Sequence, residues 1–430
     1  MVKGLKARFR NNLEVKNASW LIIGRIVQML ISFIVSIITT RYLGPQKFGV
    51  INYVTAYVTF FSSLCTLGIN SIIIKDFINH PSDQGMSIGT TIFLRILAGI
   101  SSTLMIVGII SVVDRGESET VLIGLLCSIA LIFQSFDTIN YWYQSKYRSK
   151  ITAIATLIAY IATAIYRVVL IVLHCSIVWF AFATSIDYIF LAAVLLFYYK
   201  KNKGPSFKVS LAKGKSLLSQ SYHYIISGAM VAIYSQTDKF MLKHMLNETE
   251  VGYYSLAHAV NVMWVFVLQA IIDSLYPTIM KLHKEDYNAY EKKNRQLYAI
   301  VIYISIFVAI CFVLFGRVAI NLIYGKEYEP ATLPLNIVAW YTIFSYLGVA
   351  RNAWIVCENN QRYLKYMYFS AAILNIILNF ILIPILGTSG AALASLLTQI
   401  LTSIVLPYFI KEMRPNVKLM IEAFLLRNVK

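Results

Sequence analysis

The chain has 430 residues, of which 58% are hydrophobic and 13% charged, and its mean hydropathy is +0.66. Soluble domains contain about half apolar and a quarter charged residues, so this composition excludes an ordinary soluble enzyme and a disordered chain. The net charge of +18 does not indicate nucleic-acid binding, because Lys and Arg form short clusters between apolar runs. These runs have about 20 residues, the length that spans a bilayer core. The sequence therefore predicts an all-α polytopic membrane protein.

Twelve apolar runs, separated by charged residues or by Pro and Gly, predict twelve transmembrane helices. In chain order they cover 18–40, 49–73, 87–112, 120–143, 151–173, 176–199, 221–243, 252–275, 297–323, 333–356, 364–386 and 388–410. We expect two six-helix lobes around a central cavity. The N-terminal lobe covers 1–199, a basic cytoplasmic linker covers 200–220, and the C-terminal lobe covers 221–430.

Both ends of the chain carry short amphipathic segments. Leu5, Phe9 and Leu13 share one helical face among basic residues. A second such face, near the C-terminus, is formed by Val417, Met420, Ile421 and Phe424. Because these faces suit the headgroup region of an anionic leaflet, we expect both segments to lie at the membrane interface. The first apolar run is longer than a signal peptide and lacks a cleavage site, so we expect it to be retained as a span.

The positions of the basic residues predict the orientation of the protein. With the N-terminus in the cytoplasm, most of the 38 Lys and Arg residues fall in cytoplasmic segments, including the cluster over 200–215. Loops rich in Lys and Arg remain on the cytoplasmic side of the membrane. We therefore expect both termini in the cytoplasm, and the positive charge then needs no acidic partner and no nucleic acid.

The two halves of the chain resemble each other weakly. At an offset of 203 residues, the link over 43–49 (LGPQKFG) aligns with the link over 246–252 (LNETEVG). Six spans in each half give both halves the same orientation, which predicts a parallel repeat with its axis along the membrane normal. A binding site is then expected between the lobes near the midplane.

Polar side chains recur at helical spacing within the predicted spans. Because a charge in the bilayer core costs at least a few kcal/mol, such stripes are expected to line a water-filled vestibule. Gln28 and Tyr224 are expected to line this cavity. The stripes include Arg25, Gln28 and Ser32 in the first span, Thr91 and Arg95 in the third, Gln134, Asp137 and Tyr141 in the fourth, Tyr160, Thr163 and Arg167 in the fifth, and Tyr224, Tyr234 and Asp238 in the seventh.

Four arginines within the predicted spans are candidates to bind an anionic headgroup: Arg25, Arg95, Arg167 and Arg351. Arg25 and Arg95 lie about 10–12 Å from the cytoplasmic end of their helices, at 1.5 Å per residue. A guanidinium group stays charged and binds phosphate oxygens in a bidentate fork, so both suit a pyrophosphate. Arg167 lies deeper in the membrane. It either binds the headgroup at the next position along its path across the membrane, or it pairs with an aspartate and only holds helices together. Arg351 binds the substrate or extends to the nearby interface.

Intramembrane carboxylates are candidates for ion coupling. A buried carboxyl group can take up and release a proton, unless a neighbouring Arg holds it ionised. Asp187 lies closest to the midplane and is the main candidate for a relay, and Asp137 and Asp187 are the candidates to pair with Arg167. Asp238 precedes Lys239 near the end of its helix, so we expect either a structural role or a proton relay there.

Motifs of enzyme chemistry do not occur in the sequence. It contains no Walker loop, no G-x-S-x-G or H-E-x-x-H motif, and no pair of His or Cys residues with zinc spacing. The five cysteines lie within or beside apolar runs, as packing residues do. We therefore expect no enzymatic activity, no metal and no cofactor.

Five stretches, spread over nearly the whole chain, are similar to one family of transporters. They are TRYLGPQKFGVINY (40–53), LGINSIIIKDF (67–77), QTDKFMLKHMLNETEVGYYSLAHAV (236–260), IYGKEYEPA (323–331) and ILNIILNFILIPILGTSGAALASLLTQ (373–399). In order and spacing they resemble the polysaccharide transporters, the Wzx-type O-antigen flippases. Arg25 falls where these transporters and the related lipid II flippases carry a cation on the first helix. Lys47 departs from the acidic residue often found in the family's first external link.

The resemblance implies a fold and a function. The family belongs to the multidrug/oligosaccharidyl-lipid/polysaccharide (MOP) exporter superfamily, with two six-helix lobes around a central cavity. It implies that the protein moves an undecaprenyl-pyrophosphate-linked oligosaccharide, an O-antigen or capsule repeat unit, across the bacterial plasma membrane. Transport by alternating access would be driven by a proton or sodium gradient. A glycan polymerase and a chain-length regulator are the implied partners.

Two alternative functions stay open at this point. An ion-coupled multidrug exporter of the same superfamily would want carboxylates in its N-terminal lobe, where this chain has an excess of Arg. A membrane glycan polymerase would usually carry a large polar external loop, and the predicted external loops here are short.

Overall fold

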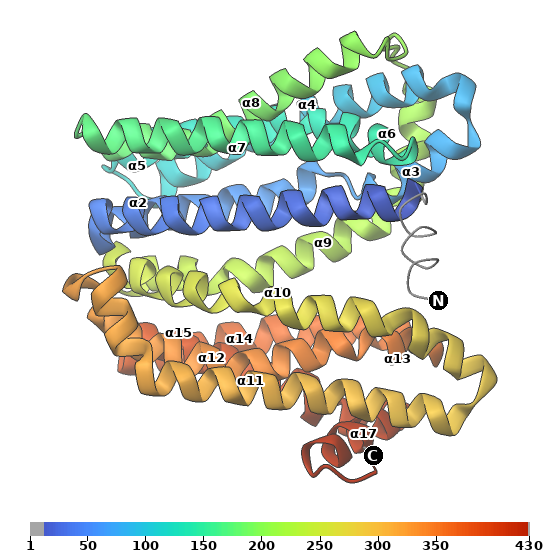
Figure 1. The fold of residues 1–430 in the computed structure, drawn as a ribbon. Coiled ribbons are helices and arrows are strands. Elements are labelled where there is room, and N and C mark those ends of the chain that lie inside the picture. The colour runs from blue at the N-terminus through green and yellow to red at the C-terminus, as the bar shows by residue number, and fades with distance from the viewer. Residues whose placement is uncertain (1–12, 429–430) are drawn as a thin grey trace, which may run out of the picture. The chain divides into compact units, whose positions relative to one another are not determined.

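The computed structural model describes the backbone of residues 13–428 and, except at residue 71, the side chains of residues 27–428. Within this part the chain is helical and forms no strand (Figure 1). The α-helices up to residue 201 are α2 (Leu13–Cys65), α3 (Asn70–Asn79), α4 (Gln84–Val113), α5 (Ser118–Phe133), α6 (Asp137–Ser145), α7 (Ser149–Val172) and α8 (Ile177–Lys201). The expected all-α membrane fold is confirmed.

After residue 201 the described chain forms nine further α-helices, and short helical elements occur in both halves of the chain. The α-helices are α9 (Leu211–Met245), α10 (Glu248–Glu285), α11 (Tyr287–Ile323), α12 (Thr332–Ala350), α13 (Asn352–Cys357), α14 (Leu364–Leu386), α15 (Thr388–Ile400), α16 (Leu406–Phe409) and α17 (Arg414–Phe424). The short elements are η1 (Pro81–Asp83), η2 (Gln134–Phe136), η3 (Lys326–Ala331), η4 (Gln361–Tyr363) and the π-helix η5 (Leu401–Val405).

Ten segments of the described chain are long and apolar enough to cross a membrane. The expected number was twelve, and two helices account for the difference. One is α2, which covers the first predicted span and most of the second as a single element of 53 residues. Its path changes at Gly44, where φ is 71° and Pro45 follows. The other is α9, which covers the predicted span 221–243 but is not among the ten apolar segments. A multi-span membrane protein is confirmed, and the count of twelve stays a prediction.

The chain forms two compact units, and each is described by itself. Unit 1 contains the residues up to Leu43 and Val54–Ala232, and unit 2 contains Gly44–Tyr53 and Ile233–Lys430. Two helices, α2 and α9, therefore contribute residues to both units. The predicted domain boundaries, including a linker over 200–220, stay predictions.

Unit 1 is built on close contacts among α4, α5, α7 and α8. The side of α7 that is buried carries small residues three or four positions apart, which let neighbouring helices approach. These are Thr152, Ala155, Ala159 and Thr163. An extended strap over 204–210 lies on the first turns of α4: the amide of Lys208 donates to the carbonyl of Gly85 at 3.1 Å, and the amide of Ser210 donates to the Thr90 hydroxyl at 3.0 Å.

Unit 2 is built on α10, α11, α12, α14 and α15, with α17 packed beside one end of α11 (Figure 1). Its core cluster includes Leu297, Tyr298, Trp354 and Met420, each no more than 2% exposed. On another side, α11 exposes large apolar side chains at helical spacing, as a helix does toward lipid. These are Phe307, Leu314, Val318 and Leu322.

Two glycines allow a close backbone contact inside unit 2. A Cβ atom added to Gly49 would overlap the carbonyl oxygen of Glu248, and one added to Gly252 would overlap the carbonyl oxygen of Pro45. The contact is reciprocal. Gly49 and Gly252, like Pro45 and Glu248, are separated by 203 residues, the offset that aligns the two predicted repeat links. The links that resemble each other in sequence therefore pack against each other.

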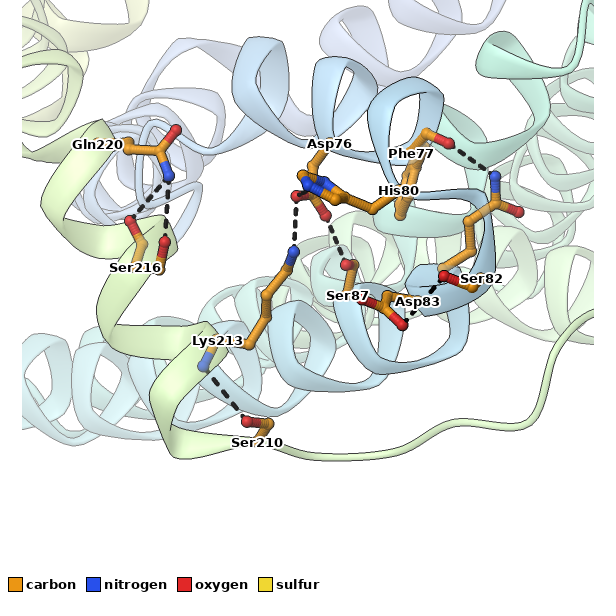
Figure 2. A network of polar contacts seen from close by, with 11 residues as sticks. Asp76, Phe77, His80, Ser82, Asp83, Ser87, Ser210, Lys213, Ser216 and Gln220 are labelled. Carbon is orange, nitrogen blue, oxygen red and sulfur yellow. Dashed lines mark hydrogen bonds and ion pairs between the residues drawn. The ribbon is translucent and has the colours of Figure 1, made fainter.

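A polar network joins α3, α4 and α9 within unit 1 (Figure 2). Asp76 on α3 accepts a hydrogen bond from the Lys213 ammonium at 2.6 Å and another from the Ser87 hydroxyl at 2.5 Å. His80, which directly follows α3, lies 3.2 Å from the same carboxylate. Burial opposes ionisation of this group, but the Lys213 and Ser87 hydrogen bonds outweigh it and hold the pKa of Asp76 below its ordinary value. The network fastens the first turn of α9 to unit 1.

We expect Gly252→Ala to lower the apparent Tm in detergent, because the added methyl group must displace the Pro45 carbonyl. Overpacking of this kind costs roughly 1–3 kcal/mol. Gly108→Ala is the matched control, since Gly108 also lies in a helix and nothing lies within 4 Å of the added Cβ. A Gly252→Ala protein that melts at the temperature of the Gly108→Ala protein would contradict the close approach.

We expect Asp76→Asn to destabilise the protein at pH 7 by about 1.5–3 kcal/mol, the contribution of a hydrogen bond to a charged group. Because the folded pKa lies below that of an unfolded Asp, about 3.9, the stabilisation is complete above that value and is lost as the pH falls through the folded one. Thermal unfolding at several pH values measures the gap between wild type and variant, which should close in acid. Asp83→Asn, at the last residue of η1, is the control. A gap that does not change with pH would refute the ionic role.

Candidate functional site

Unit 1 contains a small polar cavity of about 90 Å³ between α2, α7 and α8. Its lining includes Ser32 of α2, Tyr160 and Arg167 of α7, and Asp187 of α8. The Tyr160 hydroxyl donates to the Ser32 hydroxyl at 2.8 Å, and the Thr163 hydroxyl donates to Asp187 at 3.3 Å. The structure thus brings together polar residues that the sequence predicted on three separate helices.

Arg167 and Asp187 both face this cavity and are half-buried. They attract each other electrostatically, but no ion pair within 4.0 Å joins them in the described part of the chain. The guanidinium group is therefore partly neutralised and still has donors to offer an anion. An arginine held in this way can bind phosphate oxygens, because its planar guanidinium presents several N–H donors in a fork that matches a phosphate.

Arg95 lies in a second polar cluster of unit 1, between α4 and α6. It is only 2% exposed, and its guanidinium donates to the Thr138 hydroxyl at 3.4 Å. Asp137 interacts with it electrostatically and accepts a hydrogen bond from the Asn140 amide at 3.2 Å. The Nε of Arg95 is buried with no hydrogen-bond partner among the described residues. Arg95 is therefore closed off from a ligand in this conformation.

The other predicted residues of unit 1 are less informative. Arg25 lies on α2, but its side chain is outside the described residues, as are Leu5 and Phe9. Gln28 is half-buried on the same helix. Tyr224 on α9 is 58% exposed, and its Cβ lies against Gly68, where the chain turns between α2 and α3. Substrate contacts by these residues stay predictions.

Arg351 is buried in unit 2, with 5% of its surface exposed. Its guanidinium donates to the carbonyl oxygens of Thr402 and Ser403, both at 3.3 Å. These carbonyls belong to the π-helix η5, whose wider turn changes the regular hydrogen-bond ladder of α15. These hydrogen bonds link Arg351, which follows α12, to η5 within unit 2. Its predicted contact with substrate stays a prediction.

Asp238 is the centre of a buried polar cluster in unit 2. It is 5% exposed on α9 and accepts hydrogen bonds from the Asn379 amide and the Ser395 hydroxyl, both at 2.6 Å. The Tyr254 hydroxyl donates to the same carboxylate. Asn379 also donates to Asn375 at 3.1 Å. One carboxylate therefore gathers side chains from α10, α14 and α15 around α9.

The sequence identified Asp238 but missed its partners. Asn375 and Asn379 lie four residues apart within the apolar run of α14, so they share one helical face. Two amides on one face of an apolar helix are a usable signal for a buried polar cluster, because lipid cannot hydrogen-bond them. Ser395 and Tyr254 carry no such signal, since single hydroxyl residues are common in membrane helices.

The family model and the curated relatives that match this chain all concern polysaccharide or glycan biosynthesis. The family described as "Polysaccharide biosynthesis protein" matches residues 15–283. The capsular polysaccharide biosynthesis protein CapF of Staphylococcus aureus is 24% identical over 419 residues, which cover 92% of this chain and 99% of that protein. The probable low-salt glycan biosynthesis flippase Agl15 of Haloferax volcanii is 26% identical over 199 residues, 46% of this chain and 41% of that protein.

Solved structures of two kinds of transporter share the fold. An inward-facing multidrug resistance MATE family transporter of the MOP superfamily has a TM-score of 0.71 at 13% identity, covering 90% of this chain and 94% of that one. The lipid II flippase MurJ, in an inward closed conformation, also has a TM-score of 0.71, at 12% identity, covering 96% of this chain and 91% of that one. The resemblance seen in the sequence is thereby confirmed. The chain belongs to the polysaccharide biosynthesis protein family and has the fold of the MOP superfamily transporters.

Proposed function

We propose that the protein is a flippase for an undecaprenyl-pyrophosphate-linked oligosaccharide, an O-antigen or capsule repeat unit. It works by alternating access in the bacterial plasma membrane, with both termini in the cytoplasm. The relatives named as a glycan flippase and a capsular polysaccharide biosynthesis protein support this reading. We also infer that it is a transporter and not an enzyme, and that a glycan polymerase and a chain-length regulator work with it.

The observation that carries the proposal is the polar cavity that holds Arg167. A lipid-linked pyrophosphate has two chemical parts, an anionic headgroup with its glycan and an apolar tail. The tail can stay in lipid, so the protein needs a polar path for the headgroup only. Arg167 provides a positive charge in such a cavity, and Ser32, Tyr160 and Thr184 add hydroxyl groups beside it. An entering phosphate would compete with Asp187 for the guanidinium.

Coupling to an ion gradient is assigned to Asp238. Its hydrogen-bond donors are all neutral, and none of the ion pairs in the described chain includes it. The side-chain oxygen (Oδ1) of Asn379 is also buried, and it has no hydrogen-bond partner among the described residues. A proton or a sodium ion at this carboxylate would change the hydrogen bonds that hold α9, α10, α14 and α15 together. Ion binding would therefore alter the packing of four helices at once.

We expect Arg25→Gln and Arg167→Gln each to reduce flipping at least tenfold, because a hydrogen bond to a charged group contributes about 1.5–3 kcal/mol. The purified protein is reconstituted in liposomes with a lipid-pyrophosphate oligosaccharide. Exposure of the glycan is followed with an impermeant glycosidase. Arg115→Gln is the matched control, since Arg115 is an exposed residue between α4 and α5.

Three outcomes decide between the alternatives. Loss of exposure in both Gln variants, with Arg115→Gln unchanged, supports the transporter class and the arginine route. Exposure that survives in both variants keeps the class and rejects the arginine route. Folded protein that exposes no lipid-linked glycan but extrudes a cationic dye would make it a multidrug exporter.

We expect Asp238→Asn to abolish the response of flipping to an imposed ion gradient while the protein still folds, because Asn keeps the shape of Asp. Flipping rates are measured with a proton gradient, with a sodium gradient and with neither. Asp273→Asn is the control, since Asp273 is exposed on α10 and bonds only to Gln269 of its own helix in the described chain. If the Asp238→Asn protein responds to a gradient as the wild type does, Asp238 is not the coupling residue.

A further inference from the structure

The C-terminal helix α17 is fastened to unit 2 along one side. Val417, Met420 and Ala423 are no more than 2% exposed. The Asn416 amide donates to the Tyr298 hydroxyl at 2.7 Å, and the Tyr303 hydroxyl donates to the Phe424 carbonyl at 2.8 Å. Part of the amphipathic face predicted for the interface is therefore occupied by the protein itself, and α17 has a defined position beside α11.

A groove of about 850 Å³ runs between α17, the first turns of α11 and the turn that precedes α17. Its lining contains two acidic residues, Glu291 and Glu422, and five basic ones. The basic residues are Arg295, Lys411, Arg414, Lys418 and Arg427. The groove thus carries an excess of positive charge.

Three of these basic residues make no ion pair within the described chain. Arg295 is paired with both acids, at 2.8 Å to Glu291 and 3.2 Å to Glu422, and Lys418 lies 3.9 Å from Glu422. The three residues without an ion pair are Lys411, Arg414 and Arg427; all are exposed, and the charge of Lys411 also interacts with the neighbouring Glu412 carboxylate. The guanidinium of Arg414 donates to the Tyr408 carbonyl at 2.8 Å, which holds it at the groove.

Exposed apolar side chains border the same groove. Ile421 is 45% exposed and Leu425 is 50% exposed, and both line it. The neighbouring Phe424 and Leu426 are more than half exposed. A small soluble anion has no apolar part that could cover these exposed side chains. A phospholipid matches it, because its phosphate meets the cations while its acyl chains cover the apolar residues.

We propose that this groove binds an anionic phospholipid through its headgroup phosphate, with Lys411, Arg414 and Arg427 as the phosphate-binding residues. The acyl chains lie over Ile421 and Leu425. The lipid then bridges α17 and α11 and holds the C-terminal helix at the membrane surface. The inference does not depend on the proposed transport function, since it concerns a surface groove distant in sequence from the residues assigned to transport.

The test uses purified full-length protein in detergent, titrated with phosphatidylglycerol, with phosphatidylcholine and with glycerol 3-phosphate, and read out by native mass spectrometry and thermal shift. We expect phosphatidylglycerol to bind and to raise the apparent Tm, and the other two probes to do neither. The Lys411→Gln/Arg414→Gln/Arg427→Gln protein should bind phosphatidylglycerol roughly a hundredfold more weakly, from three lost cations near an anionic headgroup. Lys200→Gln/Lys201→Gln/Lys203→Gln, which removes three exposed cations elsewhere, should bind as the wild type does.

Unchanged affinity in the groove variant, or equal binding of phosphatidylcholine, would overturn the proposal. Equal binding of glycerol 3-phosphate would make the groove a site for a soluble phosphate instead. If the triple variant fails to fold, Lys411→Gln alone replaces it, because no hydrogen bond of the Lys411 side chain is found in the described chain and its loss should still weaken binding severalfold. Binding must also weaken as salt increases, and affinity independent of salt would reject the phosphate contacts.

Discussion

The fold of this protein depends on one constraint, that a polar group in a bilayer has no water to bind. Each buried donor or acceptor must find a partner within the protein or face a cavity. Arg351 meets this constraint in part, because one of its terminal nitrogens donates to two carbonyl groups of the π-helix η5 while its Nε has no partner among the described residues. Asp238 satisfies it with hydrogen bonds from three other helices. These polar residues therefore link helices through hydrogen bonds, in addition to the apolar contacts between them.

The two units meet this constraint in different ways. In unit 1, Arg167 and Asp187 share a small cavity, and Arg95 lies close to Asp137 between two helices. In unit 2, the central carboxylate is surrounded by neutral donors. The substrate contact proposed for Arg167 therefore lies in unit 1, and the ion coupling proposed for Asp238 lies in unit 2.

Close backbone contact complements these polar links. The reciprocal contact between Gly49 and Gly252 leaves no room for a side chain, so it places two helical segments at a fixed separation. Van der Waals packing of small residues is a main source of helix association in membranes, since lipid is as apolar as the helices themselves. The same logic explains the small residues on the buried side of α7. The C-terminal helix is a contrast, because large side chains hold it to α11.

The sequence by itself determined the fold class and the membrane character, because apolar runs and charge distribution are local properties. The family followed from the order and spacing of five stretches that resemble it. It also found Asp238 and the arginines, since charges in apolar runs are conspicuous. Only the tertiary structure decided which partners these residues have. It paired Arg351 with backbone carbonyls, gave Asp238 its amide and hydroxyl donors, and turned half of the apolar face of α17 toward α11. Helical periodicity shows which residues share a face, but long-range packing decides what that face meets.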